Sequence, residues 1–334
     1  MALTEQVVAS ADGTRIFVES TGDPTKAAIV FVHGLSSSAL GWDSQFTDPD
    51  LLRDFHLVRY DMRGHGRSGK PLDPSQYESR RFAEDFKAAC DACEVKKPFF
   101  AGWSLGGCVV VDIVAAHGPS FLSGVLYIGG GVLSLPKYHP QCATPFINTL
   151  IPQLLSTDPD DVSRAAEAFV DSCTAPGKLL PYPQKLQWLG AFVAQPKSVR
   201  VLNISRAQPY EVWEQHARNL PVLIVQGTED QHCLYENMIR LAKEVYDDVE
   251  VKMLEGIGHS PSVENPAETN RYIREWANRI ARGQSPLMYR TLCMPQLSTD
   301  RHIPPSASAL NRSEVPVAAL DSSGLFGVPS RGRS

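Results

Sequence analysis

The sequence predicts an α/β fold in which a mostly parallel, twisted sheet has helices on both faces. Apolar runs of strand length alternate with amphipathic helical patterns along most of the chain. The stretch FFAGWSLGG, residues 99–107, passes from an apolar run through a glycine-rich turn into another apolar run, which indicates a strand, a sharp turn and a buried helix. Over residues 132–219 the strand patterns stop and helical ones continue, which indicates a helical insertion.

The first third of the chain already alternates strands and helices. The segment VVASADGTRIFVES alternates apolar and polar residues around Asp12 and Gly13, which predicts an antiparallel hairpin at the sheet edge. Residues 27–35 are a continuous β-branched run with no polar face, typical of a central strand that is covered on both sides. Residues 56–68 indicate another strand that runs into a glycine-rich turn, and FAEDFKAACDACE follows as an amphipathic helix.

The rest of the chain completes the sheet after the helical interruption. Residues 122–131 predict the sixth strand, and the segments PVLIVQGTED and VEVKMLEGIGH predict the seventh and eighth. Residues 284–334 are poor in periodicity and rich in Ser, Pro and Gly, so we expect a disordered or loosely docked tail. The predicted organisation is an α/β core over residues 1–131 and 220–283, a helical insertion over residues 132–219 that covers the sheet as a lid, and the tail.

The last helix has a clear start signal. Asn265 can cap it, Pro266 suits the first helical position, and Glu268 completes the spacing of a capping box. An apolar face of tyrosine, isoleucine and tryptophan follows at helical spacing. We therefore predict a helix that begins at Asn265.

The composition of the 334-residue chain is that of a soluble globular protein. Hydrophobic residues make up 43%, charged residues 21%, and the formal net charge is -5. There is no basic stripe, which argues against a nucleic-acid partner. The N-terminus lacks an export signal and no run approaches membrane-spanning length, so we expect a cytoplasmic protein with no membrane span. The sequence carries no signal of an oligomeric state.

The cysteines do not form a recognisable framework. There are 7, an odd number scattered along the chain, and without an export signal we expect reduced thiols. Cys90 and Cys93 form a C-x-x-C pattern, but no second pair follows at metal-ligand spacing. We interpret them as small, half-buried helix residues rather than as a redox or zinc site, and we predict no metal site.

Ser104 is the candidate nucleophile. It lies at the turn in Gly102-Trp103-Ser104-Leu105-Gly106, where the glycines leave room for neighbouring backbone and the strained turn exposes the hydroxyl. A serine hydroxyl needs a base to remove its proton, and the base needs a third group to orient it. The sequence should therefore also hold a histidine and a carboxylate at strand ends.

Asp230 and His259 meet that requirement. Asp230 ends the seventh predicted strand, and His259 ends the eighth, after two glycines that let the backbone turn. Ligands of open α/β sheets bind at the carboxyl ends of the strands, so the three side chains should meet there. The chain order of nucleophile, acid and base is that of an elbow-type hydrolase.

Other residues compete for these roles. Glu229 comes one residue before the expected acid position, and Asp112 lies inside the predicted elbow helix, away from any strand end. Among the 9 histidines, His33 and His65 also border glycine turns. We interpret these two as structural groups that hydrogen-bond loops near the site.

Acyl transfer also needs two donors for the oxyanion. The backbone N–H of Leu105 directly follows the nucleophile at the start of a helix. The second donor should come from the loop after the first central strand, where the N–H of Leu35 follows Gly34. Loss of one such donor typically raises the barrier by about 3 kcal/mol.

Taken together, these motifs resemble the α/β-hydrolase superfamily. The set comprises His33-Gly34, DMRGHGRS, GWSLGG, GTED and GIGHSP, in that order over about residues 10–282. More narrowly, the chain is similar to the capped esterase, enol-lactonase and cofactor-free haloperoxidase-like group. The resemblance implies a core sheet with a helical lid between the sixth and seventh strands, and a Ser-Asp-His triad. Epoxide hydrolases and haloalkane dehalogenases of this fold carry an aspartate where this chain has Ser104.

The leading hypothesis is a serine hydrolase without metal or organic cofactor. Its partner would be a small or medium, largely apolar ester, thioester or lactone, cleaved through an acyl-enzyme on Ser104. Relatives of this fold also cleave carbon-carbon bonds or make peracids with the same triad, and the motifs do not separate these activities. A third possibility is a hydrolase-fold ligand-binding receptor, which only fold analogy supports.

Aromatic residues are the candidates for substrate binding. Phe146, Trp188, Tyr182 and Phe192 lie in the predicted lid, and Trp103 adjoins the nucleophile. Trp42, in the loop after the oxyanion turn, is a further candidate. Aromatic residues at helical spacing are more often packing residues than ligand contacts, so both interpretations stay open.

Overall fold

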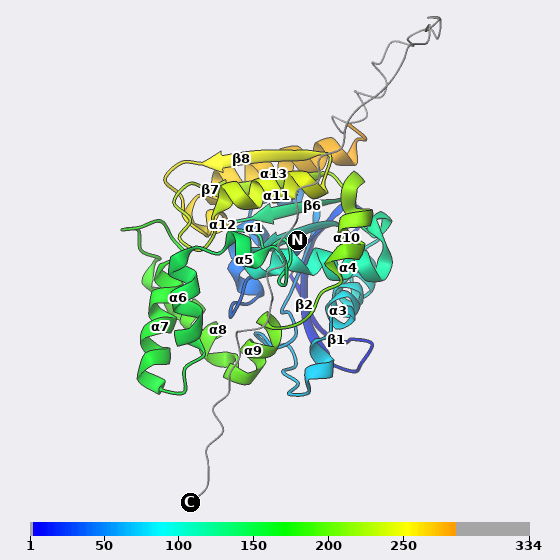
Figure 1. Ribbon diagram of the computed structural model, residues 1–334. Helices are drawn as coiled ribbons and strands as arrows, with labels where there is room; N and C mark the ends of the chain where they lie inside the picture. Colours follow the sequence, from blue (N-terminus) through cyan, green and yellow to red (C-terminus); the bar gives the residue numbers. More distant parts are fainter. Residues whose placement is uncertain (1–2, 285–334) are drawn as a thin grey trace, which may run out of the picture. The chain divides into compact units, whose positions relative to one another are not determined.

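Eight strands form one sheet, in the spatial order β1-β2-β4-β3-β5-β6-β7-β8 (Figure 1). The computed structural model describes residues 3–284, so the predicted tail lies outside the described residues except for its first residue. The pairings β1–β2 and β2–β4 are antiparallel, and all others are parallel, which confirms the predicted mostly parallel sheet. The strands are β1 (Thr4–Ala9), β2 (Arg15–Gly22), β3 (Ala28–Val32), β4 (His56–Tyr60), β5 (Phe99–Trp103), β6 (Gly124–Ile128), β7 (Val222–Gly227) and β8 (Val249–Leu254).

The central strands are buried on both faces. Every residue of β3, β4, β5, β6 and β7 is buried, as expected for apolar parallel strands between helices. Successive residues of a strand point to opposite faces of the sheet. Val30 and Val32 of β3 therefore join one cluster of the core, whereas Ile29 and Phe31 join another.

Helices cover both faces of this sheet (Figure 1). Phe86, Val110 and Leu241, from three different helices, join the cluster that contains Val30 and Val32. Leu51 and Trp276 join the cluster on the opposite face. The helices that supply these side chains are α2 (Pro49–Asp54), α3 (Ser79–Ala92), α4 (Val109–His117), α11 (Tyr235–Val245) and α13 (Pro266–Ala281). The predicted two-sided cover is confirmed.

The predicted cap of the last helix is confirmed, whereas the two cysteines are more deeply buried than the half-buried helix residues that we expected. The side chain of Asn265 accepts a hydrogen bond from the N–H of Glu268 at 3.3 Å and so caps α13. Cys90 lies within α3 and Cys93 directly follows it. Both are buried free thiols, and burial raises the pKa of each, so these side chains act as packing groups.

Between β6 and β7, in a segment that is described throughout, the chain forms helices and no strand. Three of these helices, α6, α7 and α8, pack on one another through a separate hydrophobic cluster. It includes Ile147, Leu154, Ala166 and Phe192. We call α5 to α9 the inserted helices. Their bounds are α5 (His139–Cys142), α6 (Pro145–Leu154), α7 (Pro159–Asp171), α8 (Tyr182–Ala194) and α9 (Lys197–Ile204).

The last helix of the segment, α10 (Tyr210–His216), packs on α4 of the core instead. Its Trp213 is fully buried in the core cluster beside the sheet. The indole Nε1 of Trp213 donates to the Tyr246 hydroxyl at 3.0 Å, and its ring packs edge-on against Tyr138. The end of the predicted insertion at residues 132–219 therefore belongs to the core layer, because a tryptophan anchors it there.

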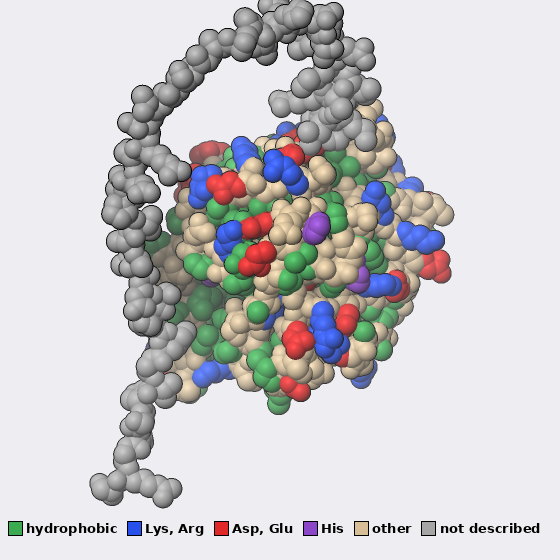
Figure 2. All heavy atoms as spheres, turned by 45° about the vertical axis from the view of Figure 1, so that its right-hand side comes forward, with side chains coloured by type: hydrophobic (Ala, Val, Ile, Leu, Met, Phe, Trp, Pro, Cys, Tyr) green, Lys and Arg blue, Asp and Glu red, His purple; other side chains and the backbone are tan. Residues whose placement is uncertain are grey.

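The surface carries charges of both signs. On the face that Figure 2 displays, acidic and basic side chains are intermixed and do not form a stripe of one sign. Within residues 3–284, none of the helices combines the length and the apolar character needed to cross a membrane.

The turn after β5 is strained. Ser104 has a φ of +50°, in the left-handed region that residues other than glycine rarely adopt. The short 3-10 helix η3 (Ser104–Cys108) follows and leads into α4. A Cβ on Gly102 would lie 2.7 Å from the Cα of Gly107, and a Cβ on Gly106 would lie 2.4 Å from the carbonyl oxygen of Val32. The predicted strand, sharp turn and helix are confirmed, and the glycines are required by close backbone packing.

Gly106→Ala should therefore destabilise the protein by about 1–3 kcal/mol, because the new methyl group must displace the backbone of β3. Gly190→Ala is the matched control, because Gly190 lies in α8 with open space around its Cα. We expect that control to stabilise the protein by up to about 1 kcal/mol through helix propensity. Urea unfolding of both variants measures the two effects, and an unchanged midpoint for Gly106→Ala would contradict the packing account.

Candidate active site

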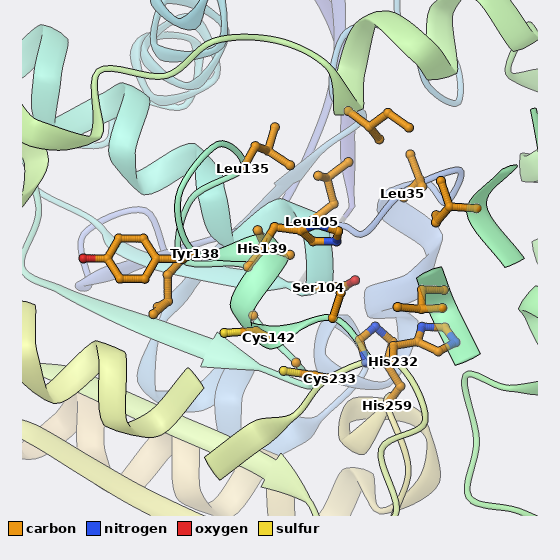
Figure 3. Close-up of a pocket in the computed structure, with 18 of the residues that line it drawn as sticks. Leu35, Ser104, Leu105, Leu135, Tyr138, His139, Cys142, His232, Cys233 and His259 are labelled. Atoms are coloured by element: carbon orange, nitrogen blue, oxygen red, sulfur yellow. The ribbon is translucent and has the colours of Figure 1, made fainter. Parts of the chain in front are cut away.

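The candidate site lies at the carboxyl ends of the parallel strands. Ser104 directly follows β5, Leu35 lies in the loop after β3, Asp230 follows β7 and His259 follows β8. The carboxyl ends of parallel strands meet at one edge of the sheet, which is why residues so far apart in sequence come together. Leu35, Ser104 and His259 line a common cavity of about 160 Å³ (Figure 3).

His259 and Asp230 form a buried pair. The Nδ1 of His259 lies 3.0 Å from both carboxylate oxygens of Asp230. Burial raises the pKa of Asp230, but the charge of His259 and its hydrogen bond outweigh burial and bring that pKa down to about 2. An ionised carboxylate only accepts hydrogen bonds, so Nδ1 of His259 is the donor and its Nε2 is free to act as a base.

Backbone and side-chain donors hold Asp230 in place. Its Oδ1 accepts the N–H groups of His232 at 2.8 Å and Cys233 at 3.1 Å. Its Oδ2 accepts Nε2 of Gln226 at 2.8 Å. These bonds stabilise the ionised carboxylate and fix it against His259.

The two competing carboxylates lie elsewhere. Glu229 is exposed to solvent. Asp112 is buried in α4, where its carboxylate accepts hydrogen bonds from Arg206, Gln208 and Ser79. The structure therefore brings Asp230 to His259, and places Asp112 in an ion pair that joins α4 to the chain before α10.

The backbone around Ser104 is anchored on the end of β6. Its N–H donates to the carbonyl of Gly129 at 3.2 Å, and its carbonyl accepts the N–H of Val132 at 2.9 Å. A Cβ on Gly34 would lie 3.2 Å from the Cβ of Ser104. The loop that carries Leu35 thus passes close to the serine, as the oxyanion hypothesis requires.

His33 and His65 have the structural role that the sequence predicts. The Nε2 of His33 accepts the N–H of Met62 at 3.0 Å. The Nδ1 of His65 lies 3.2 Å from the Arg63 carbonyl, and its Nε2 lies 2.9 Å from the amide nitrogen of Gln195. Both rings connect loops near the cavity.

The three tryptophans proposed as substrate contacts lie in the core and do not line the cavity. Trp42 is fully buried against Phe31. Trp103 directly precedes Ser104, so its side chain points to the opposite face, where it packs on Trp188 with ring centroids 5.2 Å apart. Its Nε1 donates to the carbonyl of His259 at 2.9 Å, which ties the end of β5 to the loop that carries His259.

The other aromatic candidates from the predicted lid, for which both interpretations were open, do not line the cavity either. Phe146 on α6 is 41% exposed and stacks on His232 at 6.3 Å, outside the cavity lining. Tyr182 is exposed, and Phe192 packs among the inserted helices. Of these three, only Phe192 buries its ring between helices, whereas Phe146 and Tyr182 keep much of theirs in contact with solvent.

Aliphatic side chains form most of the actual lining. They come from the loops after β3, β6 and β7, from η3 and from the inserted helices, so no single sequence motif marks them. The apolar residues that line the cavity, besides glycines, are Leu35, Leu105, Val132, Leu133, Leu135, Tyr138, Cys142, Ala143, Ile147, Ile151, Phe169, Ile204 and Cys233.

His232 is the main residue that sequence reasoning missed. Its ring lies 4.2 Å from that of His259, and Figure 3 shows both rings next to Ser104. Its Nε2 lies 2.8 Å from the hydroxyl of Ser172, which itself donates to the Phe169 carbonyl, so Nε2 of His232 is the donor. Burial, and then the charge of His259, hold the pKa of His232 well below its usual range. The only signal was its place two residues after Asp230.

The described residues contain no group of three or more His, Cys, Asp or Glu side chains that could hold a metal ion.

Buried histidines predict a loss of stability in mild acid. Burial lowers the pKa of His33, His65 and His232. The unfolded chain takes up protons at these residues near pH 6.5, whereas the folded protein does so only at lower pH, so their stabilising contribution is complete above about pH 6.5 and decreases below it. We expect the free energy of unfolding to fall by about 1 kcal/mol per neutral histidine between about pH 7.5 and pH 5.5.

Urea unfolding at the two pH values measures this loss. His232→Gln should reduce it, whereas His216→Gln, at an exposed position, should leave it unchanged. Equal stability of the parent protein at both pH values would contradict the assignment of neutral buried rings.

Comparisons with solved structures give the same fold. The chain resembles a Burkholderia cenocepacia protein assigned as an aryl esterase, with 27% identity and a TM-score of 0.75 over 83% of this chain and 99% of that one. It also resembles the esterase RhEst1 from Rhodococcus sp. ECU1013, with 27% identity and a TM-score of 0.72 over the same shares of the two chains.

Sequence comparisons add two relatives and a family. The non-heme chloroperoxidase of Streptomyces lividans is 25% identical over 278 residues, which cover 78% of this chain and 96% of that protein. A stretch of 91 residues is 43% identical to the probable oxidoreductase EphD of Mycobacterium tuberculosis, of which it covers 15%. The model of the alpha/beta hydrolase family matches residues 29–272. The protein belongs to the alpha/beta hydrolase family.

Proposed function

We propose that the protein is a serine hydrolase that cleaves small, largely apolar esters, thioesters or lactones. The observation that carries the proposal is the His259–Asp230 pair, with both Nδ1–O distances at 3.0 Å, beside a strained serine in the same cavity. Two similar structures at 27% identity are those of esterases or proteins assigned as such, which supports a hydrolase.

In the proposed mechanism, Nε2 of His259 takes the proton of the Ser104 hydroxyl as the serine oxygen attacks the carbonyl carbon of the substrate. The N–H groups of Leu35 and Leu105 bind the oxyanion of the tetrahedral intermediate. His259 then gives its proton to the leaving alcohol or thiol, which leaves an acyl group on Ser104. Water, deprotonated by His259, releases the acid and restores the serine.

Asp230 supports both steps. Its pKa of about 2 keeps it negatively charged across the working range of a histidine base. It therefore holds the His259 ring in one orientation and stabilises the imidazolium that forms when His259 takes a proton. His232, neutral and with its ring 4.2 Å from that of His259, adds no positive charge that would compete with that imidazolium.

The cavity supports a neutral acyl group of modest size. Its volume of about 160 Å³ is close to that of an apolar protein cavity of about 150 Å³ that binds benzene. None of the lining residues is Asp, Glu, Lys or Arg. A carboxylate buried there without a partner would cost several kcal/mol, about 100-fold or more in rate.

Ser104→Ala tests the nucleophile. We expect kcat/KM on p-nitrophenyl butyrate to fall at least about 1,000-fold, because the attacking oxygen is lost. Fluorophosphonate labelling should disappear in the same variant. Ser205→Ala, at an exposed serine after α9, is the control and should keep both. Retained activity in Ser104→Ala would overturn the proposal.

A panel of p-nitrophenyl esters tests the substrate class. We expect kcat/KM to be highest for butyrate to hexanoate and to fall roughly 10-fold or more for decanoate, which overfills the cavity. The hemisuccinate, which carries a charge on the acyl chain, should react far more slowly than the butyrate. Equal rates for these two esters would contradict the neutral acyl pocket, and saturable binding without turnover would favour a receptor.

A further inference from the structure

The loop after β3 contains a strained residue, as the turn at Ser104 does. Ser36 has a φ of +53° and is buried. Such a conformation costs a residue other than glycine about 1–3 kcal/mol, and it persists only where surrounding contacts hold it. Ser36 directly follows Leu35, whose N–H is the proposed second oxyanion donor. Whatever holds Ser36 therefore also positions that donor.

The contacts that hold Ser36 come from the inserted helices. Its hydroxyl donates to Oε1 of Gln195 at 2.7 Å, directly after α8. The Ser36 hydroxyl oxygen also accepts a hydrogen bond from Nε of Arg200, in α9, at 3.0 Å. The amide nitrogen of Gln195 also bonds the ring of His65 at 2.9 Å, so the contact extends to the loop after β4.

Arg200 is an unusual partner, because it is a buried cation without a carboxylate. Within the described residues its guanidinium bonds neutral oxygens: Ser36 Oγ and the carbonyls of Leu154, Phe192 and Gln195. Burial lowers its pKa to about 10, so it stays charged at neutral pH.

The carbonyls that surround Arg200 lie at the C-terminal ends of α6 and α8. Carbonyls at such ends have no partner within the helix and carry partial negative charge, which favours a cation. Arg200 thus forms hydrogen bonds with the C-terminal ends of two inserted helices and with Ser36. The guanidinium therefore has all of its hydrogen-bond partners only when α6, α8 and α9 are packed against the loop that carries Leu35 and Ser36.

We propose that Ser36, Gln195 and Arg200 couple the docking of the inserted helices to the formation of the oxyanion hole. When the helices are docked, Ser36 is held in its strained conformation and the Leu35 N–H points at the oxyanion. When they separate, Ser36 relaxes and the hole loses one donor. These three are positioning residues, since they act through the Leu35 backbone, and the inference rests on the proposed hydrolase function.

Ser36→Ala is the direct test. The variant keeps a Cβ at the strained position but loses both hydroxyl contacts, so the loop relaxes. We expect kcat on p-nitrophenyl butyrate to fall roughly 10- to 100-fold, up to the range seen when one oxyanion donor is removed. KM should change less than about 2-fold, because the aliphatic lining is intact.

Two companion variants separate positioning from general damage. Ser38→Ala, in the same loop, is the control, because the Ser38 side chain makes no capping bond, and we expect wild-type kinetics. Ser36→Gly loses the same hydroxyl but removes the strain, since glycine adopts positive φ freely. Its kcat should lie between those of the wild type and Ser36→Ala. A Ser36→Ala variant with wild-type kcat, or a Ser36→Gly variant below Ser36→Ala, would overturn the proposal.

Hydrogen exchange of Arg200→Lys provides a test that does not depend on turnover. Lysine cannot reach all the oxygens that the guanidinium bonds, so we expect faster exchange in α8 and α9 and, with it, in residues 34–38. Faster exchange in the helices with unchanged exchange in the loop would contradict the coupling. Failure of the proposed function is distinguishable, because it would show as a wild-type protein without esterase activity or Ser104 labelling.

Discussion

The site depends on one backbone constraint, the left-handed conformation of Ser104 between β5 and the helix that follows. That turn exists because glycines on both sides let β3, β5 and the helix approach to within backbone contact; a single methyl group on Gly106 would meet a carbonyl of β3 at 2.4 Å. Close packing of strand ends also brings the loop after β3 against the serine. The position of the hydroxyl and that of the loop after β3 are therefore set by the same contact.

The electrostatics of the cavity follow from what is buried with the serine. One ionised carboxylate, Asp230, faces the ring of His259, while burial keeps the neighbouring ring of His232 neutral. None of the residues that line the cavity is Asp, Glu, Lys or Arg. Charge can therefore develop at His259 with one partner to stabilise it, and the cation Arg200 is held outside the lining, against helix ends.

The sheet and the strand-end residues could be predicted from sequence because their signals are local. The apolar run of β3 and the glycines around Ser104 each predict the backbone conformation of the few residues around them. The cavity lining could not be predicted in this way, because Ile151 and Ile204 reach the cavity only through the packing of separate helices. Trp42 and Trp188 lie in the core and not in the cavity for a physical reason. Tryptophan has a large apolar area, and the core removes nearly all of that area from water.

The most direct test of the account is the site of the covalent intermediate. Rapid quenching of the protein during turnover of p-nitrophenyl butyrate, followed by digestion and mass spectrometry, should show a butyryl group on the peptide that contains Ser104. We expect an adduct on that serine, formed and lost at rates that match turnover. Turnover without an acyl group on Ser104, or with the group on another residue, would contradict it.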